Sequence, residues 1–415
     1  MKPRGPQPDA RRGPAGASVP VTGAEPLPDA VADVRPFMER YVRQLTAAGA
    51  IQSAEVERAF AAVERHRLLE TFYYRPAGSA QAAVIRHDPG RPVAGHLAII
   101  YADNALATRH AGGFPSSSTS QPSLMAKMLE FLRLAAGMKI LEIGAGTGYN
   151  AALMAELTGN QRLVVTLDVQ EDVVEQTRRL LAAAGYPDIR VLAGDGADGA
   201  PGDAPFDRVV ATVGCSDLSP AWAGQLRDGG QMLVPLAHAG GHPLVLLRKE
   251  HGQLRGRFAA WTGFIPIRGQ LHIEGLWERG IVMAWPGEPV GQRQPWPGFG
   301  AGGVVDSLGC SADEIGLLFF LGLHDRRACL APEGVGLSAG VNGWAAASPA
   351  GIRWWKDASL ADELEVLYER WRGHGQPGPE DYEVSFAAMG ADAAPPPGSW
   401  QIERRFYQEF IQLAR

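Results

Sequence analysis

A run of glycines follows a short apolar segment in the first half of the chain. The motif reads Glu142-Ile143-Gly144-Ala145-Gly146-Thr147-Gly148-Tyr149 and comes directly behind the apolar residues 138–141. This order predicts a strand that runs into a tight turn, with a helix beginning behind the turn. Because glycine has no Cβ, the backbone N–H groups of such a turn can approach a bound ligand closely.

Two acids follow the next two apolar runs. Asp168 ends the second run, about 20 residues after Gly146, where an acid typically accepts hydrogen bonds from ribose hydroxyls. Asp195 follows the third run in Gly194-Asp195-Gly196. There it would bond an adenine amino group while Gly196 lets the base approach, although a simple turn or a helix cap would also explain either acid. Both acids lie at carboxyl ends of predicted parallel strands, where open α/β sheets bind ligands.

These residues predict a site for a nucleotide-like cofactor. Glu142 ends the first strand, where it would organise the turn or meet the amino group of the ligand. The predicted cofactor-binding residues are Glu142, Gly144, Ala145, Gly146, Thr147, Gly148, Asp168, Val169, Asp195, Gly196 and Ala197. The spacing E-x-G-x-G-x-G is close to the dinucleotide fingerprint but not identical to it. Taken alone, it leaves a nicotinamide cofactor and S-adenosylmethionine both open.

The apolar runs around the turn predict alternating strands and helices. We expect strands at residues 138–143, 163–168, 189–193, 208–213 and 231–236, and helices at 149–157, 172–184 and 222–226. Such alternation implies parallel pairing with right-handed crossovers. Residues 242–249, 254–260 and 262–267 should follow as antiparallel strands. The predicted fold class is α/β, a Rossmann-like parallel sheet with an antiparallel edge.

The flanking segments complete the expected organisation. Helical spacing predicts helices within residues 36–74 and a further helix beginning at Pro122. Residues 83–85 and 97–101 are expected to form strands or ordered loop, and the Gly, Pro, Ser and Thr cluster at 112–120 a loop. Residues 1–33 predict a disordered tail by composition. Behind the main domain at 34–275, we expect a linker at 276–303 and a smaller C-terminal α+β unit at 304–415.

Composition excludes several classes of protein. The 415 residues are 46% hydrophobic and 20% charged, an ordinary globular balance, and the formal net charge of −6 gives no basic footprint for nucleic acid. No apolar run is long enough to predict a membrane span. The three cysteines, Cys215, Cys310 and Cys329, are widely spaced and odd in number. They favour reduced thiols in a cytoplasmic protein over disulfides or a metal site.

Several separate motifs, in the same order, resemble the protein L-isoaspartate O-methyltransferase family. The resemblance covers residues 34 to about 269 and rests on Leu45-x3-Gly49-x-Ile51, Val63-x-Arg65-His66, Ser120-Gln121-Pro122, the glycine motif from Leu141 to Tyr149, Gly194-Asp195-Gly196, Phe206-Asp207-Arg208 and Phe264-Ile265-Pro266. It implies S-adenosylmethionine as the methyl donor and a carboxylate as the acceptor. It also implies a class I methyltransferase fold for residues 34–275.

The same resemblance implies the catalytic residues. Ser120 keeps the position of the active-site serine of the family, and Ser118 stands where repair enzymes of the family have threonine. With Thr119 between them, these hydroxyls are predicted to hold the acceptor carboxylate. A carboxylate with a pKa of about 3.9 is already ionised at neutral pH, so methyl transfer needs alignment more than a strong base.

Three departures from the repair enzymes favour a different acceptor. Ser123 replaces a bulky residue, Arg268 stands where threonine is usual, and the C-terminal unit is expected to be absent from repair enzymes. Ser123 and Arg268 are therefore predicted to bind substrate, as is the C-terminal unit. The serine run and the extension resemble a subgroup associated with ribosomally made lanthipeptides and graspetides. That resemblance implies methylation of an aspartate in a cyclised precursor peptide, followed by closure to an aspartimide.

Two other functions stay open from the sequence. One is a repair enzyme acting on isoaspartyl residues of damaged proteins. The other is a binding module without activity, which the intact glycine motif and both acids disfavour.

Some other residues could suggest further sites. His238 and His242 are four apart, but Gly240-Gly241 interrupts the segment, so no metal site is expected. The aromatic residues Trp354, Trp355, Trp371 and Trp400 could line a peptide groove, although core packing is the simpler interpretation. Cys215 is expected to pack rather than react.

Overall fold

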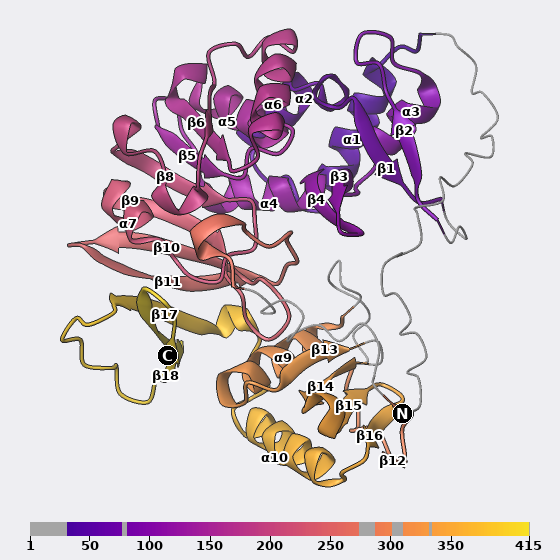
Figure 1. The fold of residues 1–415 in the computed structure, drawn as a ribbon, viewed down its shortest axis with the longest axis vertical. Helices are drawn as coiled ribbons and strands as arrows, with labels where there is room; N and C mark the ends of the chain where they lie inside the picture. Colours follow the sequence, from indigo (N-terminus) through magenta and orange to yellow (C-terminus); the bar gives the residue numbers. More distant parts are fainter. Residues whose placement is uncertain (1–30, 77–80, 274–286, 301–309, 332–333, 415) are drawn as a thin grey trace, which may run out of the picture.

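One large mixed sheet organises the protein. The computed structural model describes residues 31–76, 81–273, 287–300, 310–331 and 334–414, so the predicted tail lies almost wholly outside the described residues. The ten strands of the sheet lie in the order β18-β19-β17-β11-β10-β9-β8-β5-β6-β7. Figure 1 shows this sheet running from the C-terminal strands, in yellow, up to β5 and β6.

The parallel half of the sheet is built as the sequence predicts. It contains β5 (Ile140–Ile143), β6 (Val164–Asp168), β7 (Arg190–Ala193), β8 (Phe206–Ala211) and β9 (Leu226–Pro235), each paired in parallel with its neighbour. The helices between them are α5 (Tyr149–Thr158), α6 (Glu171–Ala183) and α7 (Pro220–Gln225). Every residue of β5 is buried, as expected for a strand covered on both faces.

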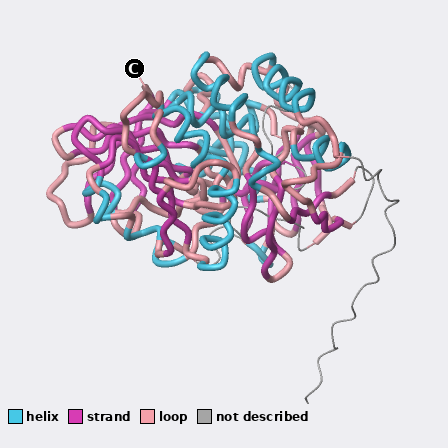
Figure 2. Tube along the Cα trace, turned by 90° about the horizontal axis from the view of Figure 1, so that it is seen from above, coloured by secondary structure: helices cyan, strands magenta, loops and turns pink. Residues whose placement is uncertain are grey.

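Residues facing opposite sides of the sheet enter two different cores. Ile140 packs in a cluster with α4 (Pro122–Leu132), α5 and the N-terminal helices α1 (Arg35–Ala47) and α2 (Ala54–Ala62). Its neighbour Leu141 packs in the other cluster, with Trp222 of α7 and the C-terminal residues. This alternation follows from the two-residue period of a strand. Figure 2 distinguishes the strands from the helices that cover them.

The antiparallel edge is longer than the sequence predicts. Strands β10 (Leu244–Glu250) and β11 (Gln253–Ala260) pair as expected, and the sheet then continues into β17 (Tyr382–Ala388), β19 (Tyr407–Leu413) and β18 (Trp400–Glu403). The expected third strand at 262–267 is wrong. Its residues form a loop with one isolated bridge, Gly214 to Pro266.

A second sheet lies beside the first, at the lower end of the molecule in Figure 1. It has the order β12-β16-β15-β14-β13. Its strands are β12 (Gly291–Arg293), β13 (Ala328–Ala331), β14 (Gly334–Ser338), β15 (Trp344–Ser348) and β16 (Gly351–Trp355). Helices α9 (Ala312–His324) and α10 (Ser359–Gly373) pack on it. A serine cap with a reciprocal glutamate, Ser311 and Glu314, begins α9.

The C-terminal region is therefore not one separate unit. Residues 304–415 contribute both to the small sheet and, through β17, β18 and β19, to the large one. The expected linker also contains β12, which pairs with β16. The reason is an open edge: β11 would otherwise leave its backbone groups unpaired, and β17 satisfies them.

The N-terminal region differs from expectation at two places. Residues 97–101, expected as a strand or ordered loop, lie mostly in the helix α3 (Ala94–Ile100), of which Leu97 and Ile100 are buried. The serine segment, expected as a loop, forms β4 (Phe114–Thr119), paired with β3 (Leu106–Ala111). A second hairpin, β1 (Thr71–Tyr74) with β2 (Ala83–Arg86), packs beside β3.

Candidate functional site

The glycine turn between β5 and α5 has a conformation that only glycine adopts readily. Gly144 has φ +104° and Gly146 has φ +52°. A Cβ added to Gly144 would come within 2.8 Å of Thr212 Oγ1, and one added to Gly146 within 2.9 Å of the Ser118 carbonyl oxygen. The turn is thus held between the end of β8 and the serine strand β4.

A cavity of about 250 Å³ opens between this turn and β4. It brings together most of the predicted site residues. The lining includes Ser116 to Gln121, Glu142 to Thr147, Asp168 to Gln170, Gly196 and residues 263–268. The predicted residues that do not line it are Gly148, Asp195, Ala197 and Ser123.

Glu142 lies at the bottom of the cavity with both carboxylate oxygens bonded. Its Oε1 accepts a hydrogen bond from Asn150 Nδ2 at 2.8 Å, and its Oε2 accepts one from Thr166 Oγ1 at 2.7 Å. Burial raises the pKa of Glu142 to about 7, although both hydrogen bonds act to lower it. The side chain therefore organises the first turn of α5 and also presents a titratable carboxyl group to the cavity.

Asp168 ends β6 and faces the turn. Its Oδ2 accepts a long hydrogen bond of 3.4 Å from the Gly146 N–H, and its Oδ1 accepts one of 3.1 Å from the Gln170 N–H. These contacts leave lone pairs of both oxygens for other donors. The position at the carboxyl end of a parallel strand is the one at which α/β sheets bind ribose hydroxyls.

Asp195 does not line the cavity, and both of its carboxylate oxygens accept backbone hydrogen bonds. Its Oδ1 accepts from the Ala197 N–H at 2.9 Å, and its Oδ2 accepts from the Gln270 N–H at 2.8 Å. The carboxylate thereby ties the end of β7 to the segment behind the loop 263–268. Gly196 faces the cavity, where a Cβ would come within 2.8 Å of Ile143 Cγ2.

The serine strand forms the opposite wall. Ser118, Thr119 and Ser120 all line the cavity. The buried Thr119 Oγ1 has no hydrogen-bond partner among the described residues. The backbone of Ser120 is fixed by Arg65, whose Nη2 donates a hydrogen bond to the Ser120 carbonyl oxygen at 3.1 Å.

The two predicted substrate-binding residues lie in different places. Arg268 is the only basic side chain among the described lining residues, and its Nη1 donates to Gln170 Oε1 at 3.1 Å. Ser123 lies in the first turn of α4, where its backbone N–H donates to Asp103 Oδ1 at 2.8 Å. Ser123 does not line the cavity, so a serine here, where repair enzymes have a bulky residue, does not change the lining directly.

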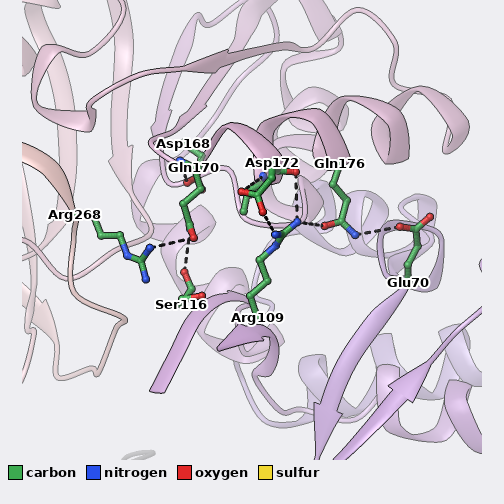
Figure 3. A network of polar contacts seen from close by, with 9 residues as sticks. Glu70, Arg109, Ser116, Asp168, Gln170, Asp172, Gln176 and Arg268 are labelled. Carbon is green, nitrogen blue, oxygen red and sulfur yellow. Dashed lines mark hydrogen bonds and ion pairs between the residues drawn. The ribbon is translucent and has the colours of Figure 1, made fainter. Parts of the chain in front are cut away.

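A network of polar contacts joins the hairpin of β3 and β4 to the cofactor side of the cavity (Figure 3). Gln170 Nε2 donates to the Ser116 carbonyl oxygen at 3.1 Å. Arg109 of β3 forms an ion pair with Asp172, and its Nη2 donates to Gln176 Oε1 at 2.9 Å. Gln176 in turn donates to Glu70. The acceptor wall is thus attached to helix α6 and to the segment behind Asp168.

Sequence reasoning missed three residues that shape the site. Arg65 is fully buried and its guanidinium also donates to the carbonyl oxygen of Ile100 at 2.6 Å. Asn150 has a buried Oδ1 without a hydrogen-bond partner among the described residues. Gln170 bridges Arg268 and the serine strand. Only the positions of two of these residues in the sequence could have indicated a role at the site. Asn150 lies in the first helical turn behind the glycines, and Gln170 lies two residues after Asp168.

The other suggestive residues have structural surroundings. His238 and His242 are buried and take part in no group of metal-binding side chains among the described residues. Trp371 is buried, whereas Trp354 and Trp355 are half-buried, and a Cβ on Gly291 or Gly287 would collide with their rings. Burial raises the pKa of the Cys215 thiol, which disfavours a reactive thiolate. No described helix is long and apolar enough to span a bilayer.

The cavity fits the methyl donor implied by the sequence resemblance. Glu142 and the buried Asn150 Oδ1 offer acceptors for an ammonium group, and Asp168 offers acceptors for ribose hydroxyls. Gly144, Gly146 and Gly196 all line the cavity, and at each of them an added Cβ would collide with the surrounding protein. S-adenosylmethionine supplies an electrophilic methyl group on a sulfonium ion, and these residues would hold its polar ends.

Known proteins match this chain over the same region. A family model described as protein-L-isoaspartate(D-aspartate) O-methyltransferase matches residues 38–272, more than half of the chain. A protein-L-isoaspartate O-methyltransferase of Thermococcus sibiricus is 35% identical over 236 residues, which cover 56% of this chain and 93% of the relative. The enzyme of that name from Thermotoga maritima is 36% identical over 177 residues, and there the match spans 42% of this chain and 56% of the relative.

One solved structure reaches beyond the methyltransferase region. It is named protein-L-isoaspartate O-methyltransferase, is 26% identical and has a TM-score of 0.50, over 86% of this chain and 97% of its own. Residues 34–275 are less than two thirds of the chain, so this match extends into the C-terminal region. The expectation that such an extension separates this chain from enzymes of that name is therefore wrong. The chain belongs to the protein-L-isoaspartate(D-aspartate) O-methyltransferase family of S-adenosylmethionine-dependent carboxyl methyltransferases.

Proposed function

We propose that this protein methylates the free carboxylate of L-isoaspartyl residues in peptides and proteins. The observation that carries the proposal is the shared cavity, in which the hydroxyl-bearing strand β4 faces the glycine turn. The relatives bear the name of this activity, and the solved structure of the same name accounts for part of the C-terminal region as well.

The residues of the cavity suit an acceptor that is already charged. An isoaspartyl carboxylate is ionised at neutral pH, so no proton has to be removed before transfer. Ser120 and Thr119 would donate hydrogen bonds to its oxygens, and such charge-assisted bonds are stronger than neutral ones. Arg268 at the edge of the cavity adds a positive charge. The protein therefore acts by orienting one carboxylate oxygen in line with the transferable methyl group.

The product explains why methylation would lead to repair. Transfer converts the carboxylate into a methyl ester, so the carbonyl carbon gains a better leaving group. The backbone nitrogen of the next residue then attacks that carbon and loses its proton, while methanol leaves. The resulting succinimide opens with water to aspartate or isoaspartate, and this part of the sequence needs no residue of the protein.

A second acceptor remains as an alternative proposal. Arg268 in the cavity lining and the serine-rich strand motivate an aspartate of a cyclised ribosomal precursor peptide, with closure to an aspartimide. Both acceptors present a carboxylate to the same hydroxyls. They differ in the backbone around it, which an assay can distinguish.

The experiment compares acceptors on the purified full-length chain. The chain is incubated with S-adenosylmethionine and a short linear peptide containing L-isoaspartate, the same peptide with L-aspartate, and a cyclised graspetide-type peptide. We expect a mass gain of one methyl group on the isoaspartyl peptide, followed by loss of methanol, and no gain on its aspartyl control. Methylation of the cyclised peptide alone would establish the alternative instead and reject the repair activity.

A further inference from the structure

A buried ion pair joins the C-terminal strands to the loops behind the active cavity. Arg404 lies between β18 and β19, and its Nε donates to Glu409 Oε2 at 2.7 Å. The Arg404 side chain is 7% exposed and that of Glu409 is fully buried. Burial alone would raise the pKa of Glu409, but Arg404 and His238 outweigh it and lower the pKa to about 2. The pair is therefore ionised at neutral pH.

Most of the donors of Arg404 point away from Glu409 to two loops. Arg404 Nη1 donates to the Ser216 carbonyl oxygen at 2.7 Å, behind β8, and Nη2 donates to the Ala237 carbonyl oxygen at 3.2 Å, behind β9. Nη2 also lies 2.9 Å from His238 Nε2. The same His238 nitrogen lies 3.2 Å from Glu409 Oε1, so the buried ring contacts both members of the ion pair. One guanidinium thus holds the loops that follow two neighbouring strands.

These loops in turn hold the segment that closes the cavity. The Gly214 N–H donates to the Ile265 carbonyl oxygen at 2.9 Å, and the Ile267 N–H donates to the Gly214 carbonyl oxygen at 2.8 Å. Both isoleucines line the cavity. Ser216 Oγ donates to the carbonyl oxygen of Leu271 at 2.5 Å, so the far end of the same segment is tied as well.

The residues next to Arg404 reinforce this connection. Arg405 Nη1 donates to the Gln270 carbonyl oxygen at 2.6 Å. The Phe406 N–H donates to Asp217 Oδ2 at 2.6 Å, and the Asp217 side chain is buried. The segment 404–406 is therefore bonded to both sides of the path that leads from β8 to the loop 263–268.

We propose that Arg404, oriented by Glu409, is a positioning residue that sets the loop 263–268 against the acceptor cavity. Through this contact the C-terminal strands determine how the acceptor carboxylate is held, although none of their residues lines the cavity. The expected effect on the KM rests on the proposed methylation of isoaspartyl peptides. The expected effect on the rigidity of the loop is independent of that proposed function.

The test removes both charges together. Breaking one partner of a buried pair leaves an uncompensated charge, whereas replacing both with apolar residues of similar size is often neutral for stability. We expect the Arg404→Met/Glu409→Met variant to raise the KM for the isoaspartyl peptide about tenfold, with kcat changed less than threefold. The calorimetric Kd for S-adenosylmethionine should change less than threefold. Amide exchange at Gly214 and Ile267 should become faster.

Two further variants keep the result interpretable. Arg405→Ala removes an exposed side chain whose loss does not threaten the fold, and should raise the KM about two- to threefold with faster exchange in the same loop. Arg327→Met breaks the ion pairs with Asp325 and Glu363, none of which lines the cavity, and it should change neither the KM nor the amide exchange.

The outcomes separate the proposals. Wild-type KM and wild-type amide exchange in both the double variant and Arg405→Ala would overturn the positioning role. If the double variant does not fold, Arg405→Ala decides alone. If the wild-type chain methylates no isoaspartyl peptide, the proposed function fails, while the amide-exchange comparison still tests the positioning of the loop.

Discussion

Two buried atoms in the cavity wall lack a hydrogen-bond partner among the described residues, Thr119 Oγ1 and Asn150 Oδ1. A buried polar group without a partner costs about 1–3 kcal/mol, so a folded protein seldom keeps one without a use. The two atoms lie on opposite walls, on β4 and α5. A hydroxyl can donate to a carboxylate and an amide oxygen can accept from an ammonium group. A bound acceptor and a bound cofactor would therefore satisfy one atom each.

Ser120 should matter for the acceptor and not for the cofactor. Ser120 lines the cavity, and its carbonyl oxygen accepts a hydrogen bond from Arg65 that a change of side chain leaves in place. In Ser120→Ala we expect kcat/KM for the isoaspartyl peptide to fall about 10- to 100-fold, since a hydrogen bond to a charged group contributes about 1.5–3 kcal/mol. Calorimetry should show an unchanged Kd for S-adenosylmethionine.

Ser123→Ala is the matched control for this substitution. It removes the same hydroxyl three residues later, outside the cavity lining, and keeps the backbone hydrogen bond to Asp103. We expect kinetics within twofold of wild type. An equal loss of activity in both variants would show that the effect comes from the start of α4 rather than from the acceptor site.

Glu142 should make both stability and cofactor binding depend on pH. Its pKa is raised to about 7 in the folded protein, above the unfolded value near 4.3. Between these values the folded state keeps a proton that the unfolded state has lost, so the stabilising contribution falls as pH rises and is constant above about 7. The Glu142→Gln variant has no carboxyl group at this position, so it lacks this pH-dependent contribution to stability. Relative to wild type, the variant should gain up to about 3 kcal/mol between pH 5 and pH 8.

Chemical denaturation of both proteins at pH 5 and pH 8 measures this difference. Cofactor affinity gives an independent reading, because a cationic ligand favours the ionised carboxyl group. For the wild type, the affinity for S-adenosylmethionine should fall as pH falls from 8 to 6, and for Glu142→Gln it should stay constant. Parallel pH profiles of the two proteins would rule out Glu142 as the titrating group.

At the scale of elements, the hairpin of β3 and β4 carries the acceptor wall and is attached to α6. The attachment consists of the Arg109–Asp172 ion pair and the hydrogen bond from Gln170 to the Ser116 carbonyl oxygen. In sequence the segment 112–120 is rich in Gly, Pro and Ser, which suggested a loop. Pairing with β3 makes it a strand, and residues of this strand line the cavity.

Loosening this hairpin should weaken peptide binding while the cofactor site is preserved. In Arg109→Ala the hairpin loses its ion pair with α6, and we expect the KM for the isoaspartyl peptide to rise about two- to fivefold. The effect is modest because partly exposed pairs contribute about 0.2–1 kcal/mol. Arg162→Ala, which breaks the exposed pair with Asp188, is the control and should behave as wild type in steady-state kinetics.

The parallel half of the sheet was predictable because its signals are local. Apolar runs, the glycine turn and Asp168 depend on neighbours in sequence, and each of these appears where the pattern indicates. The hydrogen bond that Asp195 accepts from Gln270 was not predictable, since the two residues lie far apart in the chain. The pairing of β11 with β17 and the partners of Arg404 are likewise long-range. No spacing within a single segment reports such contacts.

At the scale of the whole molecule, the two sheets share one hydrophobic core. Residues of β5, β8 and β9 belong to the same buried cluster as residues of α9, α10 and β15. Deleting everything behind residue 275 would therefore remove β17 from the sheet edge and expose this core. Such a truncated chain should fail to unfold cooperatively, so it cannot report on peptide recognition alone, and point substitutions are the better probes.

Phe319 of α9 lies at the centre of this shared core and should couple the unfolding of both sheets. Its ring centroid is 4.8 Å from that of Phe258 on β11 and 5.0 Å from that of Tyr382 on β17, and its side chain is fully buried. We expect Phe319→Ala to lower the free energy of unfolding by about 3–5 kcal/mol, through lost contacts and the cavity left behind. Because the core is continuous, calorimetry should still show a single transition, shifted to lower temperature.

Val366→Ala on the exposed face of α10 is the control and should change the stability by less than about 0.5 kcal/mol. Two separated transitions in Phe319→Ala would instead mean that the two sheets unfold independently.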